Sequence, residues 1–181
     1  MEALSWLLFL PQAPATSSSL RVQIWRHLRA AGAITLQNGV WVLPASDAHV
    51  QFLRQEEAEL AAHGGTAWLF TAMPLDGDLV ERFRSERDRE YVEVVERCQG
   101  LRDELARETA AGKWTFAELE ENEQDLAKLE RWLAQIRARD FFAASGAEAA
   151  AAALAAGRQA LTAFAQVVYA QEGILPSQGA D

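Results

Sequence analysis

Two β-prone runs flank an Asn-Gly pair in the stretch Ala33-Ile-Thr-Leu-Gln-Asn-Gly-Val-Trp-Val-Leu43. Asn and Gly readily adopt the positive φ angles that the two central residues of a type I′ turn require. The flanking residues are rich in β-branched and aromatic side chains, which favour extended backbone. The stretch therefore predicts a β-hairpin.

The segments on either side of this hairpin complete a fold pattern. An apolar run at Trp6–Leu10 predicts a strand, and helical spacing at Leu20–Ala31 predicts a helix. After the hairpin, Asp47–Ala62 predicts a second helix and Trp68–Met73 another strand. This order is that of a ferredoxin-like βαββαβ unit, an α+β fold. The second helix is expected to bury Val50, Leu53, Leu60 and Ala61.

Beyond residue 75 the chain carries only helical patterns. Thr115 is followed three residues later by Glu118, the spacing of a capping box at the start of a helix. The last pattern is rich in alanine, which suits the close approach of helices. Three long helices with short connections predict an antiparallel helical bundle. Their expected first residues are Asp76 or Asp78, Thr115, and Ser145 or Gly146.

The chain is therefore expected to contain two domains. Residues 1–75 form the ferredoxin-like domain, residues 76–173 form the three-helix bundle, and residues 174–181 form a disordered tail. A hydrophobic content of 50% and six Trp residues supply enough apolar surface for folded cores.

The net charge of −9 restricts the class of protein. Most of it lies beyond Leu75, where 21 Asp and Glu stand against 13 Lys and Arg. This balance argues against a protein that coats nucleic acid through bulk charge, and it leaves room for a local basic surface.

Cysteine content and hydropathy indicate the compartment. The single cysteine, Cys98, excludes an intrachain disulfide and fits a reducing environment. Pro11 interrupts the apolar run at the N-terminus, so we interpret that run as a strand and not as a signal peptide. No run approaches the roughly 18 apolar residues of a membrane span. We expect a soluble, cytoplasmic protein without a membrane partner.

Motifs of catalysis are missing from the sequence. There is no Gly-x-Ser-x-Gly elbow, no phosphate-binding loop and no dinucleotide fingerprint. His27, His49 and His63 show no zinc-ligand spacing, and Cys98 lies on the apolar stripe of its helix. Some ferredoxin-like domains are metal-dependent nucleases with an acidic residue after the first strand, where this chain has Pro11-Gln-Ala13. The sequence predicts no enzyme, no metal and no cofactor.

Three arginines mark a candidate surface on the first predicted helix. Arg21, Arg26 and Arg29 lie off the apolar stripe, at a spacing that permits a small basic strip. Such a strip suits contact with phosphate oxygens of nucleic acid. The alternative is an ordinary solvated face of the helix.

A second candidate site surrounds Arg87. This arginine lies four residues from both Phe83 and Tyr91, so it shares an apolar face of its helix. A buried Arg requires a paired carboxylate or an anionic ligand. One interpretation is an ion pair with the next helix; its candidate carboxylates are Glu118, Glu121 and Glu123. The other is an oxyanion site of Arg84, Arg87 and Tyr91, because arginine suits bidentate contact with tetrahedral anions.

The chain resembles a known family in several segments. Trp6–Leu10, the serine-rich pause, Arg21–Leu28 and Asn38–Pro44 are similar to the N-terminal domain of the ChrB chromate-resistance regulators. The later segments Arg87–Tyr91, Glu118–Glu121, Arg131-Trp132 and Arg139–Phe141 resemble the helical part of that domain. The early part also resembles the central domain of PaaX-type repressors.

The ChrB resemblance implies a regulator of a chromate efflux operon. Operator DNA and the chromate oxyanion are the implied partners. Full ChrB proteins carry a further C-terminal domain, so a separately encoded domain of that type is a candidate partner. A second copy of the chain is another candidate partner, because ferredoxin-like domains often pair through sheet edges or helices. The alternative function is a protein-interaction module that binds a partner through its acidic bundle without contacting DNA.

Overall fold

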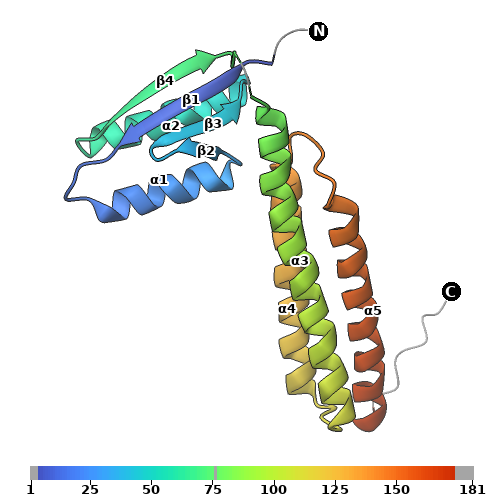
Figure 1. Ribbon diagram of the computed structural model, residues 1–181. Coiled ribbons are helices and arrows are strands. Elements are labelled where there is room, and N and C mark those ends of the chain that lie inside the picture. Colours follow the sequence, from blue (N-terminus) through green and yellow to red (C-terminus); the bar gives the residue numbers. More distant parts are fainter. Residues whose placement is uncertain (1–3, 76, 174–181) are drawn as a thin grey trace, which may run out of the picture. The chain divides into compact units, whose positions relative to one another are not determined.

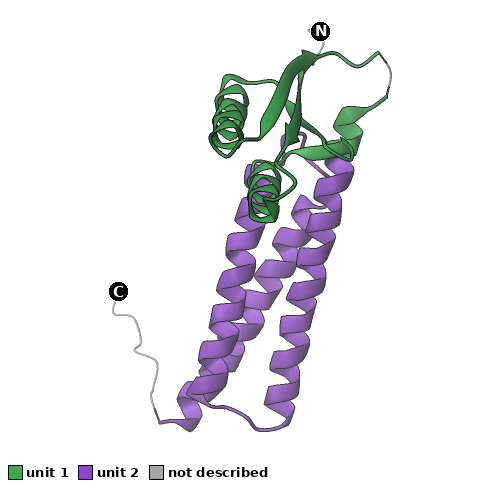
Figure 2. Cartoon of the chain, turned by 90° about the vertical axis from the view of Figure 1, so that its left-hand side faces the viewer, with its two compact units in different colours: residues 1–83 green, residues 84–181 purple. Residues whose placement is uncertain are grey.

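The computed structural model describes residues 4–75 and 77–173. Asp76, one of the two expected helix starts, and the expected disordered tail at 174–181 lie outside the described residues. The chain forms two compact units, residues 1–83 and 84–181 (Figure 2). The division between them falls inside one long helix.

The first unit has the predicted ferredoxin-like order, so the α+β fold is confirmed (Figure 1). Its sheet has the strand order β2-β3-β1-β4, and each neighbouring pair is antiparallel. The elements are β1 (Trp6–Gln12), α1 (Ser18–Ala30), β2 (Ile34–Gln37), β3 (Val40–Pro44), α2 (Asp47–Ala62) and β4 (Thr66–Ala72).

The hairpin that indicates the fold joins β2 to β3. Ile34 lies opposite Val42, and the pairing shifts between Thr35 and Gln37, which places a bulge next to the turn. Gly39 has a φ angle of +79°, the left-handed conformation that glycine adopts without steric cost. The Asn-Gly pair therefore predicted the position of the turn, but the expected type I′ conformation was wrong, because Asn38 lacks the positive φ angle that a type I′ turn requires at its first central residue.

The core of this unit lies between one face of the sheet and its two helices. Leu7 and Phe9 of β1 are buried, as are Leu43 and Trp41 opposite them on β3. The helices contribute Leu20, Ile24, Leu28, Leu53 and Leu60, all buried. At the end of the unit, the first turn of the long helix brings Phe83 onto Trp6, with ring centroids 5.3 Å apart.

The predicted buried face of α2 is partly wrong. Leu53 and Leu60 are buried, but Val50 is 37% exposed and Ala61 is exposed. Glu56 is buried instead, because His27 of α1 places its Nδ1 atom 2.9 Å from the carboxylate of Glu56. The two helices of the unit are thus joined by a polar contact that a purely apolar pattern could not indicate.

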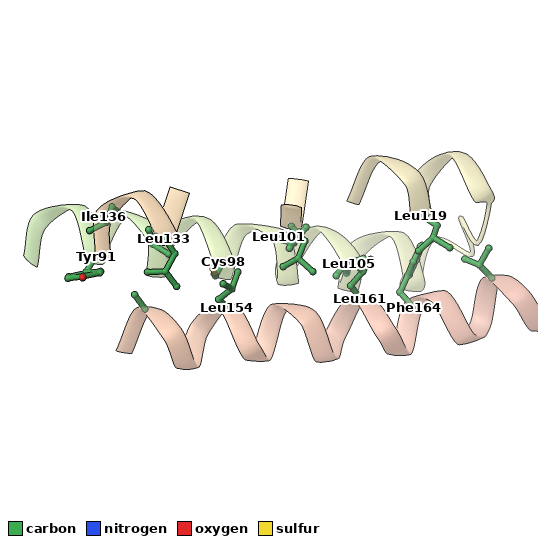
Figure 3. Packing of buried hydrophobic residues seen from close by; sticks show 14 of the residues in the cluster. Tyr91, Cys98, Leu101, Leu105, Leu119, Leu133, Ile136, Leu154, Leu161 and Phe164 are labelled. Carbon is green, nitrogen blue, oxygen red and sulfur yellow. The ribbon is translucent and has the colours of Figure 1, made fainter. Parts of the chain in front are cut away.

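The second unit is the predicted bundle of three helices. They are α3 (Leu79–Ala110), α4 (Phe116–Ala138) and α5 (Ala147–Gln171). Thr115 caps α4 by accepting a hydrogen bond from the Glu118 backbone N–H, as its spacing indicated. Leucines and aromatic residues from all three helices form one continuous core (Figure 3). Within residues 4–75 and 77–173, no helix is long and apolar enough to cross a membrane.

Two glycine substitutions should change stability in opposite directions. We expect Gly39→Ala to lower the free energy of unfolding by about 1 kcal/mol, because alanine is strained at positive φ although the space is open. We expect Gly100→Ala to raise it by about 0.5–1 kcal/mol, because Gly100 is exposed inside α3 with open space around its Cβ position. Urea unfolding measures both, and equal signs would contradict the expectation.

Candidate functional site

Helix α1 presents a basic surface to solvent. Its sequence contains three arginines and no acidic residue, whereas the whole chain has a net charge of −9. Leu20, Ile24 and Leu28 point into the core. The opposite side carries what we call the α1 basic face, which consists of Arg21, Val22, Trp25, Arg26 and Arg29.

An exposed tryptophan lies at the centre of the α1 basic face. Trp25 is 53% exposed, and it lies four residues from both Arg21 and Arg29 along the helix. Val22, 52% exposed, lies beside Arg26 in the same way. The sequence reasoning missed Trp25, although its position outside the apolar stripe was a visible signal. Arginine donors around an exposed aromatic ring are suited to contact phosphate and sugar together.

Arg21 is fixed by the loop that precedes its helix. Its Nη1 atom donates to the carbonyl oxygens of Pro14 and Ala15, at 3.0 and 3.2 Å. These bonds restrict the side chain, so less conformational entropy is lost when the guanidinium meets an anion. Arg26 is exposed and Arg29 is half-buried. The structure thus places the three predicted arginines on one helix surface, and their contact with nucleic acid stays a prediction.

The histidines each have a local partner. His49 Nδ1 lies 2.7 Å from the Pro44 carbonyl oxygen, and His63 Nδ1 lies 2.9 Å from that of Glu59. His27 contacts Glu56 as described above. Among the described residues, no group of three or more His, Cys, Asp or Glu side chains is arranged to hold a metal ion.

The second candidate site is a network of charges around Arg87. This side chain is 2% exposed, and its Nη1 atom lies 3.2 Å from a carboxylate oxygen of Glu90, one turn along α3. The other oxygen of Glu90 accepts a hydrogen bond from Arg139, at 2.9 Å. The carboxylate of Glu90 therefore pairs with two arginines. Arg139 lies at the end of α4, so the network connects α3 to α4.

The expected partners of Arg87 on α4 were wrong. Glu118, Glu121 and Glu123 belong to the start of α4, and α4 runs antiparallel to α3. The start of α4 consequently lies beside the far end of α3, where Asn122 Nδ2 donates to Glu108 at 2.9 Å. A carboxylate does meet Arg87, as its burial required, but it comes from the same helix.

Arg84 and Tyr91 both bind the connection between α4 and α5. Arg84 Nε donates to the Phe142 carbonyl oxygen at 2.9 Å, and the Tyr91 hydroxyl donates to Asp140 at 3.0 Å. Burial raises the pKa of Tyr91 to about 12, and the hydrogen bond to Asp140 adds to the effect. The three predicted anion-binding residues thus have protein partners, which favours the structural interpretation. The oxyanion site stays a prediction.

Asp88 completes the attachment of this connection. Its carboxylate accepts hydrogen bonds from the Gly146 backbone N–H at 2.7 Å and from the Ser145 hydroxyl at 3.1 Å. A Cβ atom at position 146 would lie 2.8 Å from the Cβ atom of Tyr91, closer than such atoms approach. Glycine is therefore required where α5 begins.

A groove of about 700 Å³ runs between α3 and α4. Leu101, Leu129 and Trp132 supply its apolar surface. Five carboxylates and three basic side chains line the rest of it: Glu93, Glu96, Asp103, Glu104, Asp125, Arg97, Arg107 and Lys128. The groove is acidic overall.

Comparison with known proteins supports the resemblance seen in the sequence. A family model described as "Protein ChrB, N-terminal" matches residues 21–174. The chain belongs to this family. It is 26% identical over 104 residues to Protein ChrB of Cupriavidus metallidurans, an alignment that covers 56% of this chain and 32% of that protein. The chain thus matches about a third of the length of this curated relative. No solved structure matches the chain.

Replacement of Arg87 tests whether its buried ion pair stabilises the fold more than an exposed ion pair of the same helix does. We expect Arg87→Gln to lower the free energy of unfolding by about 3 kcal/mol, because Glu90 loses a buried counter-ion. The matched control is Arg89→Gln, whose pair with Glu86 is exposed and should contribute less than about 1 kcal/mol. Equal losses in urea unfolding would contradict a structural role for Arg87.

The raised pKa of Tyr91 predicts a loss of stability at high pH. The folded pKa of about 12 exceeds the unfolded value of about 10, so the fold favours the neutral phenol. This contribution is fully present below pH 10 and is lost as the pH rises through 12. We expect Tyr91→Phe to remove part of the decline in unfolding free energy over that window. An unchanged decline in the Tyr91→Phe variant would contradict the expectation.

Proposed function

We propose that the chain is a DNA-contacting part of a ChrB-like regulator that controls transcription of a chromate efflux operon. The observation that carries the proposal is the α1 basic face, which contains no Asp or Glu although the whole chain has a net charge of −9. Family membership supports the regulatory role.

The α1 basic face has the chemistry to hold a DNA backbone. Arg26 and Arg29 contact phosphate oxygens, and Arg21 adds a donor that the loop carbonyls already orient. Trp25 packs its ring against sugar between them. Phosphate contacts position a protein on DNA without reading bases, so sequence recognition requires further contacts.

A chromate response requires that chromate binds one conformation of the protein more tightly than another. The predicted oxyanion site at Arg84, Arg87 and Tyr91 is one place for it. A chromate ion there has to compete with Glu90, Asp140 and the Phe142 carbonyl oxygen for the same donors. Binding would loosen the connection between α4 and α5, and this change is the conformational signal that we propose.

A mobility-shift titration with the DNA upstream of the chain's own gene tests the proposal. We expect a shift at physiological salt that chromate releases. Arg26→Gln and Arg29→Gln should each weaken binding on all sequences and reduce the slope of log K against log salt by about 1. Arg54→Gln is the matched control, because Arg54 is an exposed arginine of α2 that pairs with Glu57.

The absence of any shift, with or without chromate, would overturn DNA binding by this chain. Equal effects of Arg54→Gln and Arg26→Gln would overturn the role of the α1 basic face.

The acidic groove between α3 and α4 favours a second candidate function. Its apolar floor and excess of carboxylates suit a basic amphipathic helix from a protein partner. In this alternative the chain binds a separately encoded domain of the C-terminal ChrB type and contacts no DNA. Glu96→Lys together with Glu104→Lys should then abolish co-purification with that domain, whereas the α1 substitutions should have no effect.

A further inference from the structure

The two edges of the sheet in the first unit differ in how they are protected. The edge strand β2 is short and bulged, and Arg82 donates from Nη2 to the carbonyl oxygens of Thr35 and Leu36, at 2.7 and 3.3 Å. Short length, bulges and charge are the devices that keep edge strands from pairing with other chains. The edge strand β4, Thr66–Ala72, contains no charge and no proline, and its seven residues pair without a bulge with β1.

The face of β4 that points away from the helices is apolar and exposed. Trp68 is 66% exposed and Phe70 is 49% exposed, and their rings stack with centroids 6.3 Å apart. The register places Phe70 opposite Leu8 and Trp68 opposite Leu10 on β1, so these four side chains share one surface. We call it the β4 aromatic patch. It contains no charged residue.

We propose that β4 pairs antiparallel with β4 of a second copy of the chain, about a two-fold axis at Leu69. This register overlaps all seven residues of each strand. It sets Trp68 directly opposite Phe70 of the partner subunit, on the same face of the sheet, and repeats that pair on the other side of the axis. Cross-strand aromatic pairs of this kind stabilise antiparallel sheets. The two sheets become one continuous sheet of eight strands.

A second copy of the chain fits the β4 edge better than single-stranded nucleic acid does. Single-stranded nucleic acid also stacks on aromatic side chains, but it requires cations along its backbone, and the β4 aromatic patch has none. A two-fold pairing makes the strand its own complement. Although the chain carries a net charge of −9, the paired strands are uncharged and oppose no like charges.

The proposed pairing has a geometric consequence. Residues directly opposite each other in an antiparallel pair point to the same side of the sheet. The helix layers of both copies therefore lie on one side of the joined sheet, and both α1 basic faces belong to that layer. This last point rests on the proposed function, whereas the pairing itself does not.

Sedimentation velocity over a range of protein concentrations tests the pairing. We expect a monomer–dimer equilibrium, and we expect Trp68→Lys and Phe70→Lys each to raise its dissociation constant about tenfold or more. Gln37→Lys places the same charge on the other edge strand and should leave association unchanged. Circular dichroism of each variant shows that the fold is retained, as the exposure of Trp68 and Phe70 leads us to expect.

Disulfide cross-linking tests the register. Thr66 lies opposite the partner subunit's Ala72, so a mixture of Thr66→Cys and Ala72→Cys chains should form a cross-linked dimer under mild oxidation. Either variant alone should not, because its own cysteines are far apart across the axis and Cys98 is buried. A monomer at all concentrations, a dimer indifferent to both lysine substitutions, or cross-linking of one variant alone would overturn the proposal. So would binding of a poly-dT oligonucleotide that Phe70→Lys abolishes while association persists.

Discussion

Strand β1 is the constraint on which the first unit depends. It pairs over residues 6–9 with β3 on one side and along its whole length with β4 on the other, although both partners come much later in the chain. Leu7, for example, has Leu43 and Thr71 as its two neighbours. Because β1 runs parallel to β2 and β3 runs parallel to β4, right-handed crossovers place both connecting helices on the same side of the sheet. The position of α1, and with it the α1 basic face, follows from this requirement.

The sequence predicted the parts of the structure that depend on local signals. The position of the Asn-Gly turn, the cap of α4 by Thr115 and the helical periodicity each involve residues a few positions apart, and each is confirmed. The partner of Arg87 could not be predicted in the same way, because it depends on which end of α4 lies beside it. Burial of Glu56 also escaped prediction, since it requires His27 from another helix. Trp25 was not predicted for a different reason: the basic surface was predicted from charged residues alone, and Trp25 carries no charge.

Charge in this protein is separated by region. The bundle holds most of the acidic excess and leaves an acidic groove between α3 and α4. Helix α1 instead contains three arginines and no acidic residue. The chain therefore carries a basic surface on α1 and an acidic groove between α3 and α4. The net charge of −9 repels DNA at long range, so the proposed contact with DNA requires short-range attraction at the α1 basic face.

The close packing at Gly146 bears on how this protein can change over generations. Any side chain at that position collides with Tyr91, and its backbone N–H is held by Asp88. The collision involves the Cβ atom of Tyr91, which nearly every residue at position 91 would keep, so position 146 should remain glycine even where position 91 changes. Related chains should therefore keep glycine at the start of α5, whereas the solvent-facing alanines of that helix can change one at a time.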